Sequence, residues 1–167
     1  MITKRTMLLG VLLLAMIVIT CSAMAQEKSY NEMQIELTTK AISNNPNDVS
    51  AYYQRAGIYH EQGELDLALI DYNKVIELKP DFSTLVYCGR GDVYTLKGDF
   101  DKAIADYSKA IEMQPDFDYS YYLRAIAYAN KKEYNKSWAD VHKAEGLGYP
   151  VKPEFLAELK KASGRDK

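Results

Sequence analysis

Apolar and small residues recur along most of the chain with helical spacing. They return every three or four positions, as expected when about 3.6 residues complete a helical turn. The pattern breaks near Gly63, Gly98 and Lys132, and again at Pro80 and Pro115. We therefore predict six helices, over residues 48–61, 65–78, 83–97, 100–113, 117–131 and 134–145.

The breaks belong to an internal repeat. A first set recurs 35 residues later: Arg55, Tyr59, Gly63, Ala68, Tyr72 and Pro80 become Arg90, Tyr94, Gly98, Ala103, Tyr107 and Pro115. A looser third copy lies 34 residues further on, at Arg124, Tyr128, Lys132, Ser137 and Val141. Each copy is long enough for two helices joined by a turn, so the chain reads as stacked helix pairs.

Local signals mark the ends of these helices. Asp48, Ser83 and Asp116 are candidate N-caps for the first helix of each pair, and the prolines end the second helix. The second copy carries one extra residue, since ten steps separate Pro80 from Arg90. We expect it to extend the helix at its N-terminus; the alternative is a π-bulge over residues 87–91.

The repeat resembles the tetratricopeptide repeat, a pattern of aromatic, small and proline positions. The first copy matches at Tyr52, Arg55, Ala56, Tyr59, Ala68, Tyr72 and Pro80, and the second at Tyr87, Arg90, Gly91, Tyr94, Ala103, Tyr107 and Pro115. The third matches at Tyr121, Arg124, Ala125 and Tyr128, and departs at Ser137, Val141 and Tyr149. The resemblance implies an all-α fold, an α-solenoid of three helix-turn-helix pairs with capping helices at both ends.

The resemblance also divides the chain into segments. The repeats would occupy residues 47–80, 81–115 and 116–149, with a half repeat at 26–46 before them. Residues 150–167 would form a capping helix and tail, whose inner face is expected to carry Phe155, Leu156, Leu159 and Ala162.

The first 25 residues have the features of an export signal. Lys4 and Arg5 precede an uncharged apolar run of 13 residues, too short to span a bilayer comfortably, and Ala23-Met24-Ala25 follows. We predict a signal peptide over residues 1–25, cleavage before Gln26, and a periplasmic or secreted protein. The alternative is a lipoprotein attached to a membrane through Cys21, because the residues before it resemble a lipobox.

Composition excludes several classes of partner and cofactor. Lys and Arg total 21 against 23 Asp and Glu, so no basic surplus favours nucleic-acid binding. Two cysteines do not build a disulfide framework, and Cys and His are too sparse for structural zinc. We expect no cofactor.

No catalytic motif is present in the sequence. There is no Gly-rich phosphate loop, paired-His zinc helix or nucleophile elbow. A Cys88–His60 nucleophilic pair is the third-ranked alternative, and a metal site at His60, Glu61 and Asp92 ranks equally low. We therefore predict that the protein is not an enzyme.

The resemblance places a binding groove on the first helix of each pair. The candidate lining is Tyr53, His60, Glu61, Asp92, Tyr119, Tyr122 and Asn130, with Tyr53 and Tyr122 as expected anchors. Family members that bind chaperone tails present Lys, Asn and Arg there, whereas Gly57, Asp92 and Ile126 stand at three of those positions. We expect a scaffold or assembly factor of the bacterial envelope that binds another protein or an extended peptide. The alternative is a structural subunit that self-associates end to end.

A final regularity is not part of the family pattern. Arg55 and Asp71, Arg90 and Asp106, and Arg124 and Asp140 are each 16 residues apart. Both members should approach the seam between the two helices of a pair. We predict three structural Arg–carboxylate pairs, the alternative being solvated charges.

Overall fold

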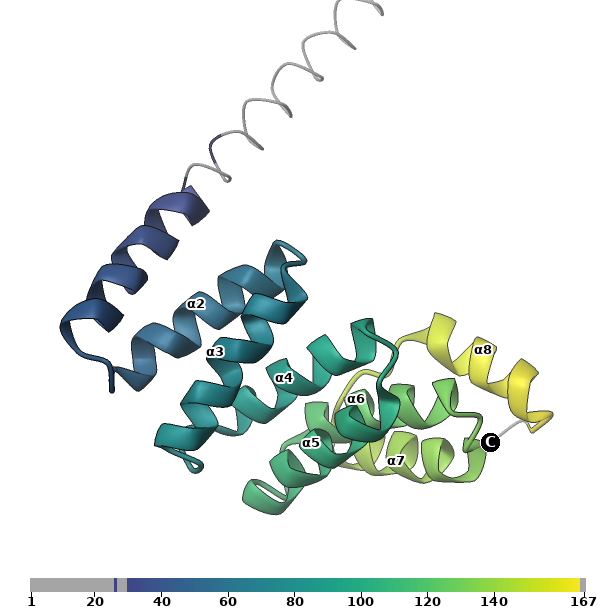
Figure 1. Ribbon diagram of the computed structural model, residues 1–167. Helices are drawn as coiled ribbons and strands as arrows, with labels where there is room; N and C mark the ends of the chain where they lie inside the picture. Colours follow the sequence, from purple (N-terminus) through teal and green to yellow (C-terminus); the bar gives the residue numbers. More distant parts are fainter. Residues whose placement is uncertain (1–25, 27–29, 166–167) are drawn as a thin grey trace, which may run out of the picture.

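The protein is all-helical in its computed structural model, which describes residue 26 and residues 30–165 (Figure 1). A helical segment over residues 30–44 precedes the remaining helices. These are α2 (Val49–Glu61), α3 (Leu65–Leu78), α4 (Thr84–Leu96), α5 (Phe100–Met113), α6 (Asp118–Asn130), α7 (Tyr134–Leu147) and α8 (Pro153–Ser163). The predicted helices are confirmed to within two residues at each end. No described helix is long and apolar enough to cross a membrane.

The helices form three pairs that stack in chain order. The first helices α2, α4 and α6 pack on the second helices α3, α5 and α7, and α3 and α5 in turn contact the next pair (Figure 1). The first helices also contact one another along the stack. This arrangement confirms the predicted α-solenoid, in which each pair covers the apolar face of its neighbour.

Two of the three predicted N-caps are confirmed. The Asp48 carboxylate accepts a hydrogen bond from the Ala51 amide at 3.0 Å, and the Ser83 hydroxyl accepts one from the Leu85 amide at 3.2 Å. The third prediction is wrong by one residue, because α6 begins at Asp118 and Phe117 takes the cap position.

The extra residue of the second copy lies between helices. The helices α2, α4 and α6 all contain 13 residues, so neither the longer helix nor the π-bulge is formed. Residues 79–83 connect α3 to α4, whereas the equivalent connection, residues 114–117, is one residue shorter. A connecting turn accommodates an insertion at lower cost than a packed helix, because few contacts depend on its length.

Small residues allow the helices to approach closely. Ala56, Ala68 and Ala103 are fully buried. A Cβ added at Gly91 would lie 2.5 Å from the Tyr107 ring, so only glycine leaves room for that ring at this position. The repeated tyrosines therefore pack into spaces that small residues on facing helices leave open.

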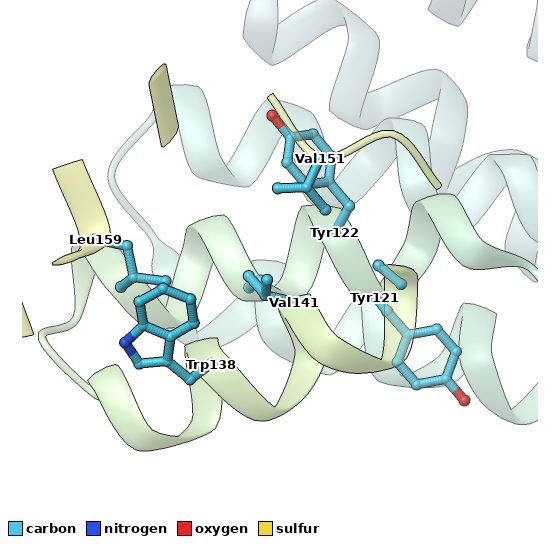
Figure 2. Close-up of a cluster of buried hydrophobic side chains, with 8 residues drawn as sticks. Tyr121, Tyr122, Trp138, Val141, Val151 and Leu159 are labelled. Carbon is cyan, nitrogen blue, oxygen red and sulfur yellow. The ribbon is translucent and has the colours of Figure 1, made fainter. Parts of the chain in front are cut away.

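The C-terminal end of the solenoid is covered by α8. Leu159 is buried against the last pair together with Trp138, Val141 and Val151 (Figure 2). The Trp138 indole N–H also donates a hydrogen bond to the Ser163 hydroxyl at 3.1 Å. This contact fixes the end of α8 on α7 and closes the apolar face of the third repeat.

Candidate binding groove

One face of α4 is exposed at its two ends and half-buried between them. Leu85, Gly89, Asp92 and Leu96 share this face, since they are spaced by four, three and four residues. Leu85 is 47% exposed and Leu96 is 64% exposed. We call this surface and its equivalents on α2 and α6 the first-helix face. Its positions are Ser50, Gln54, Gly57, Glu61, Leu85, Gly89, Asp92, Leu96, Tyr119, Leu123, Ile126 and Asn130.

Asp92 is the most unusual charge on the first-helix face. The Tyr107 hydroxyl donates a 2.7 Å hydrogen bond to its carboxylate, and the Thr95 hydroxyl lies 3.0 Å from the same Tyr107 oxygen. Burial raises the pKa of Asp92, partly offset by that hydrogen bond and by His60. Asp92 is thus a desolvated carboxylate held by a tyrosine, and the described residues include no ion-pair partner for it.

The other predicted polar residues differ in their exposure. Glu61 is exposed at the end of α2, and His60 beside it is half-buried. Asn130 is exposed, and its amide donates a hydrogen bond to the Ile126 carbonyl at 2.9 Å. Within the described part of the chain no group of His, Cys, Asp or Glu side chains could hold a metal ion.

The predicted tyrosines have unequal access to solvent. Tyr53 is half-buried, with its ring centroid 5.7 Å from that of Phe82, and burial raises the pKa of its hydroxyl. Tyr119 is also half-buried, and its pKa is raised to about 12, mainly by desolvation. Both rings remain partly available to a bound molecule.

Tyr122 does not have the accessibility that an anchor needs. It is 5% exposed, stacked on Tyr149 with centroids 4.6 Å apart, and meets the edge of Phe155. Figure 2 shows its position in the C-terminal core beside Val151. The expectation that Tyr122 anchors a partner is therefore wrong, because the chain after α7 returns over its ring.

A hollow of about 350 Å³ lies at the N-terminal end of the first-helix face. We call it the N-terminal hollow, and its lining is Tyr30, Asn31, Gln34, Tyr53, Gln54, Gly57, Ile58, Glu61 and Tyr72. Of these, Tyr53, Gly57 and Glu61 were placed on the groove from the sequence. The others were missed because the hollow depends on the packing of residues 30–44 beside α2, which no local pattern encodes.

A second hollow, of about 230 Å³, lies at the opposite end between α6 and α8. Its lining is mostly apolar: Ile126, Ala129, Asn130, Tyr134, Phe155, Glu158, Leu159 and Ala162. The first-helix face therefore runs from a tyrosine-rich end, past Asp92, to an apolar end.

The structure brings together each of the three predicted Arg–Asp pairs. Every guanidinium donates two hydrogen bonds to its carboxylate, at 2.7 and 2.9 Å for Arg55, 2.8 and 2.7 Å for Arg90, and 2.7 and 2.9 Å for Arg124. The carboxylates of Asp71, Asp106 and Asp140 are buried. The pairs lie at the helix seam, away from the first-helix face.

Each guanidinium has further partners that the sequence analysis missed. A third hydrogen bond reaches the preceding second helix, from Arg55 to Thr39, Arg90 to Asn73 and Arg124 to Ser108. Tyrosines three residues before and four residues after each arginine stack on it, with centroids 5.8 to 6.0 Å away. The acceptors Thr39, Asn73 and Ser108 lie 34 and 35 residues apart, and this spacing is the sequence signal that could have identified them.

Comparison with known families agrees with this repeated geometry. The family model described as "Tetratricopeptide repeat" matches residues 49–82, and one described as "TPR repeat" matches residues 91–132. The chain therefore contains tetratricopeptide repeats. The second match ends after α6, and α7 completes the third helix pair with a weaker copy of the pattern.

The chain is similar to several known proteins and solved structures. Hsp70-Hsp90 organizing protein 3 of Arabidopsis thaliana is 43% identical over 58 residues, which are 35% of this chain and 10% of that protein. MamA (residue 41 to the end) from Desulfovibrio magneticus RS-1 is 19% identical with a TM-score of 0.73, over 90% of this chain and 84% of that one. The first TPR of Spaghetti (RPAP3), bound to the HSP90 peptide SRMEEVD, is 22% identical with a TM-score of 0.63, over 70% and 90%.

Cys88 has no property of a nucleophile in this tetratricopeptide-repeat protein. It is 2% exposed, with its sulfur 3.4 Å from the Ser120 hydroxyl oxygen. Burial raises its pKa to about 11, so the thiol stays protonated at neutral pH. Cys88 serves as a small packing residue between α4 and α6.

Proposed function

We propose that this protein is a non-catalytic scaffold or assembly factor of the bacterial envelope, and that it binds another protein or an extended peptide on its first-helix face. The observation that carries the proposal is the middle of that face, where Leu85 and Leu96 are exposed on either side of Asp92. Burying the exposed leucines against a partner is favourable because it removes apolar surface from water. A polar or cationic group of the partner would stabilise the desolvated carboxylate.

The chemistry of the face argues against an acidic ligand. The Spaghetti domain is bound to SRMEEVD, a peptide with three carboxylate side chains. The first-helix face of this chain carries Glu61 and Asp92 and has no lysine or arginine among its defined positions. Like charges brought together across an interface are repelled, so we do not propose a chaperone-tail peptide as the ligand.

The proposed location rests on the N-terminal sequence. The basic start, the apolar run and Ala23-Met24-Ala25 support export with cleavage before Gln26. Attachment to a membrane through a lipid on Cys21 is the alternative. Residues 1–25 lie outside the described residues, so the support is from sequence alone.

Site-specific cross-linking tests the binding face. A photoreactive phenylalanine analogue would replace Leu96 on the first-helix face. In the control it would replace Ile70, which lies on the second helix α3, outside that face. The two positions are matched, being 64% and 62% exposed. We expect cross-links to a partner from position 96 and not from position 70 in cells that produce the protein. The reverse result would contradict the proposed face.

A second candidate is a self-associating structural subunit. Tyr30, Met33 and Leu37 form an exposed apolar stripe on residues 30–44, each about half exposed. A second copy covering this stripe would bury it. Light scattering over a range of concentrations separates the candidates, since a concentration-independent monomer contradicts self-association.

A further inference from the structure

One pair of facing positions has a different combination of residues in each of the three repeats. The first position is on the first helix and the second is on the second helix. In the second repeat the Tyr107 hydroxyl donates to Asp92, which lies 15 residues earlier in the chain. The same spacing places Gly57 before Tyr72 in the first repeat, and Ile126 before Val141 in the third. The polar contact is therefore specific to the second repeat.

The first repeat has glycine at this position, where the other repeats have a larger side chain, and this leaves space beside Tyr72. A Cβ added at Gly57 would meet no described neighbour within 4 Å. Hydrogen bonds among the described residues include none from the Tyr72 hydroxyl, whereas the Tyr107 hydroxyl has two partners. Gly57 and Tyr72 both line the N-terminal hollow, but Tyr72 is only 4% exposed, and a Cβ added at Gly89 of α4 would lie 2.5 Å from its hydroxyl oxygen. The floor of the hollow is therefore the open space at Gly57 above a buried tyrosine.

The walls of the N-terminal hollow are aromatic and anionic. The exposed Tyr30 and the half-buried Tyr53 supply rings, and Glu61 supplies a carboxylate. No lysine or arginine occurs among the described residues that line it. Burial raises the pKa of Tyr72, and the nearby Tyr53, Asp92 and Glu61 raise it further. The hollow thus offers one carboxylate beside aromatic rings and no positive side chain among its described lining.

We propose that the N-terminal hollow binds an arginine side chain of the partner. This deepens the proposed function, on which it rests, by naming the chemistry that the first-helix face recognises. A guanidinium stacks on tyrosine faces and donates in-plane hydrogen bonds to a carboxylate. Glu61 is the expected acceptor. The volume of about 350 Å³ admits the whole side chain.

Arginine fits this site better than lysine. The planar guanidinium can lie against a ring and still reach acceptors at its edge, whereas an ammonium group is a compact, strongly hydrated charge. The chain already uses this chemistry elsewhere, because Arg55, Arg90 and Arg124 each lie between two tyrosines and donate to a carboxylate.

The test is an NMR titration of the purified full chain with N-acetylarginine amide. We expect saturable amide shifts at residues 53–61, with a dissociation constant on the order of 1 to 10 mM for this single side chain. The neutral isostere N-acetylcitrulline amide should bind about tenfold more weakly, because it lacks the charge that Glu61 recognises.

Three variants separate charge, space and folding. Glu61→Gln should abolish the preference for arginine over citrulline, whereas Glu64→Gln, an exposed control outside the hollow, should retain it. Gly57→Leu should fill the hollow and abolish binding of both probes. Leucine favours the helix over glycine, so this variant should melt no lower than the parent protein.

Equal affinity for the two amides, or shifts confined to residues outside the hollow, would overturn the proposal. So would unchanged arginine binding by a folded Gly57→Leu variant. The cross-link at position 96 tests the proposed function separately from the arginine site. If only the arginine site is wrong, position 96 should still cross-link to the partner. The cross-link reports partner contact on α4, which contributes no residue to the hollow.

Discussion

The guanidinium of Arg90 is shared by three helices. It leaves α4, donates twice to Asp106 on α5, and reaches Asn73 on α3 with its remaining amine. The pair is largely buried, with side-chain exposures of 19% for Arg90 and 7% for Asp106. Removing one member of such a pair leaves an uncompensated charge, which costs far more than the pair itself contributes.

We expect Asp106→Ala to lower the free energy of unfolding by about 3 to 5 kcal/mol, because it leaves the Arg90 charge without its carboxylate. Urea denaturation measures the effect. The control is Asp66→Ala, which breaks the exposed ion pair with Lys97 and should cost under about 1 kcal/mol. Equal midpoints for the two variants would show that burial does not distinguish the pairs.

Asp92 should make the folded state sensitive to pH. Its pKa is raised by burial, so the folded chain binds a proton at this carboxyl more readily than the unfolded chain. The stability linked to that proton is fully present below the ordinary value of 3.8 and is lost as pH rises through the folded pKa. The ionised group therefore opposes folding at neutral pH.

Asp92→Asn should consequently be more stable than the parent protein at pH 7, and this difference should shrink toward zero below pH 3.8. The amide oxygen can still accept the Tyr107 hydrogen bond. Thermal melts across the pH range measure the effect, with the exposed Asp116→Asn as the control. A gain that is constant with pH would rule out ionisation as the cause.

At the scale of the element, the turns inside the three pairs share one conformation. Gly63 and Gly98 follow their first helices with φ of 76° and 77°, and Lys132 adopts a φ of 61° at the equivalent place. This left-handed conformation suits glycine and strains a residue with a Cβ. The third pair thus retains the turn geometry although its sequence has diverged.

Lys132→Gly should therefore stabilise the protein by about 0.5 to 1 kcal/mol. The reciprocal change Gly98→Ala should destabilise it by about 1 kcal/mol, since alanine would have to adopt the same left-handed conformation. Denaturant midpoints of the two variants measure both effects. A loss of stability in Lys132→Gly would mean that the lysine side chain contributes more than the turn strain costs.

Elements were more predictable from sequence than the site. Helix spans depend on periodicity, caps and prolines, which are local, so most boundaries agree within one residue. The predicted span 134–145 is too short because α7 continues to the left-handed cap at Gly148. Tyr122 was misplaced because Tyr149 and Phe155 cover it from the distant C-terminal segment.

The N-terminal hollow was missed for a related reason. It depends on a side chain that Gly57 lacks and on a helix that packs beside α2. By contrast, the Arg–Asp pairs could be predicted because both members repeat with fixed spacing. Their third partners, Thr39, Asn73 and Ser108, repeat in position and vary in residue type.

For the whole molecule, the described helices account for the chain from residue 30 to its C-terminal tail. We predict that export removes residues 1–25, because a charged start, a 13-residue apolar run and Ala23-Met24-Ala25 precede Gln26. Intact-mass measurement of the protein from a bacterial envelope fraction should give a chain that begins at Gln26. A lipid-modified chain that begins at Cys21 would contradict this and place the protein on a membrane surface.

The same arginine contact joins each helix pair to the helix before it, so one helix pair could stand in the place of another. Each of the three helix pairs has its own Arg and Asp, and its arginine also donates to an oxygen acceptor on the preceding helix, Thr39 on residues 30–44, Asn73 on α3 or Ser108 on α5. The three acceptors differ in residue type, yet each accepts the same hydrogen bond from the arginine of the following pair. A gene in which residues 81–115 are duplicated should therefore encode a longer solenoid with one more seam of the same kind. In evolutionary terms, this chain could change its length by recombination and keep the arginine contact at the new seam.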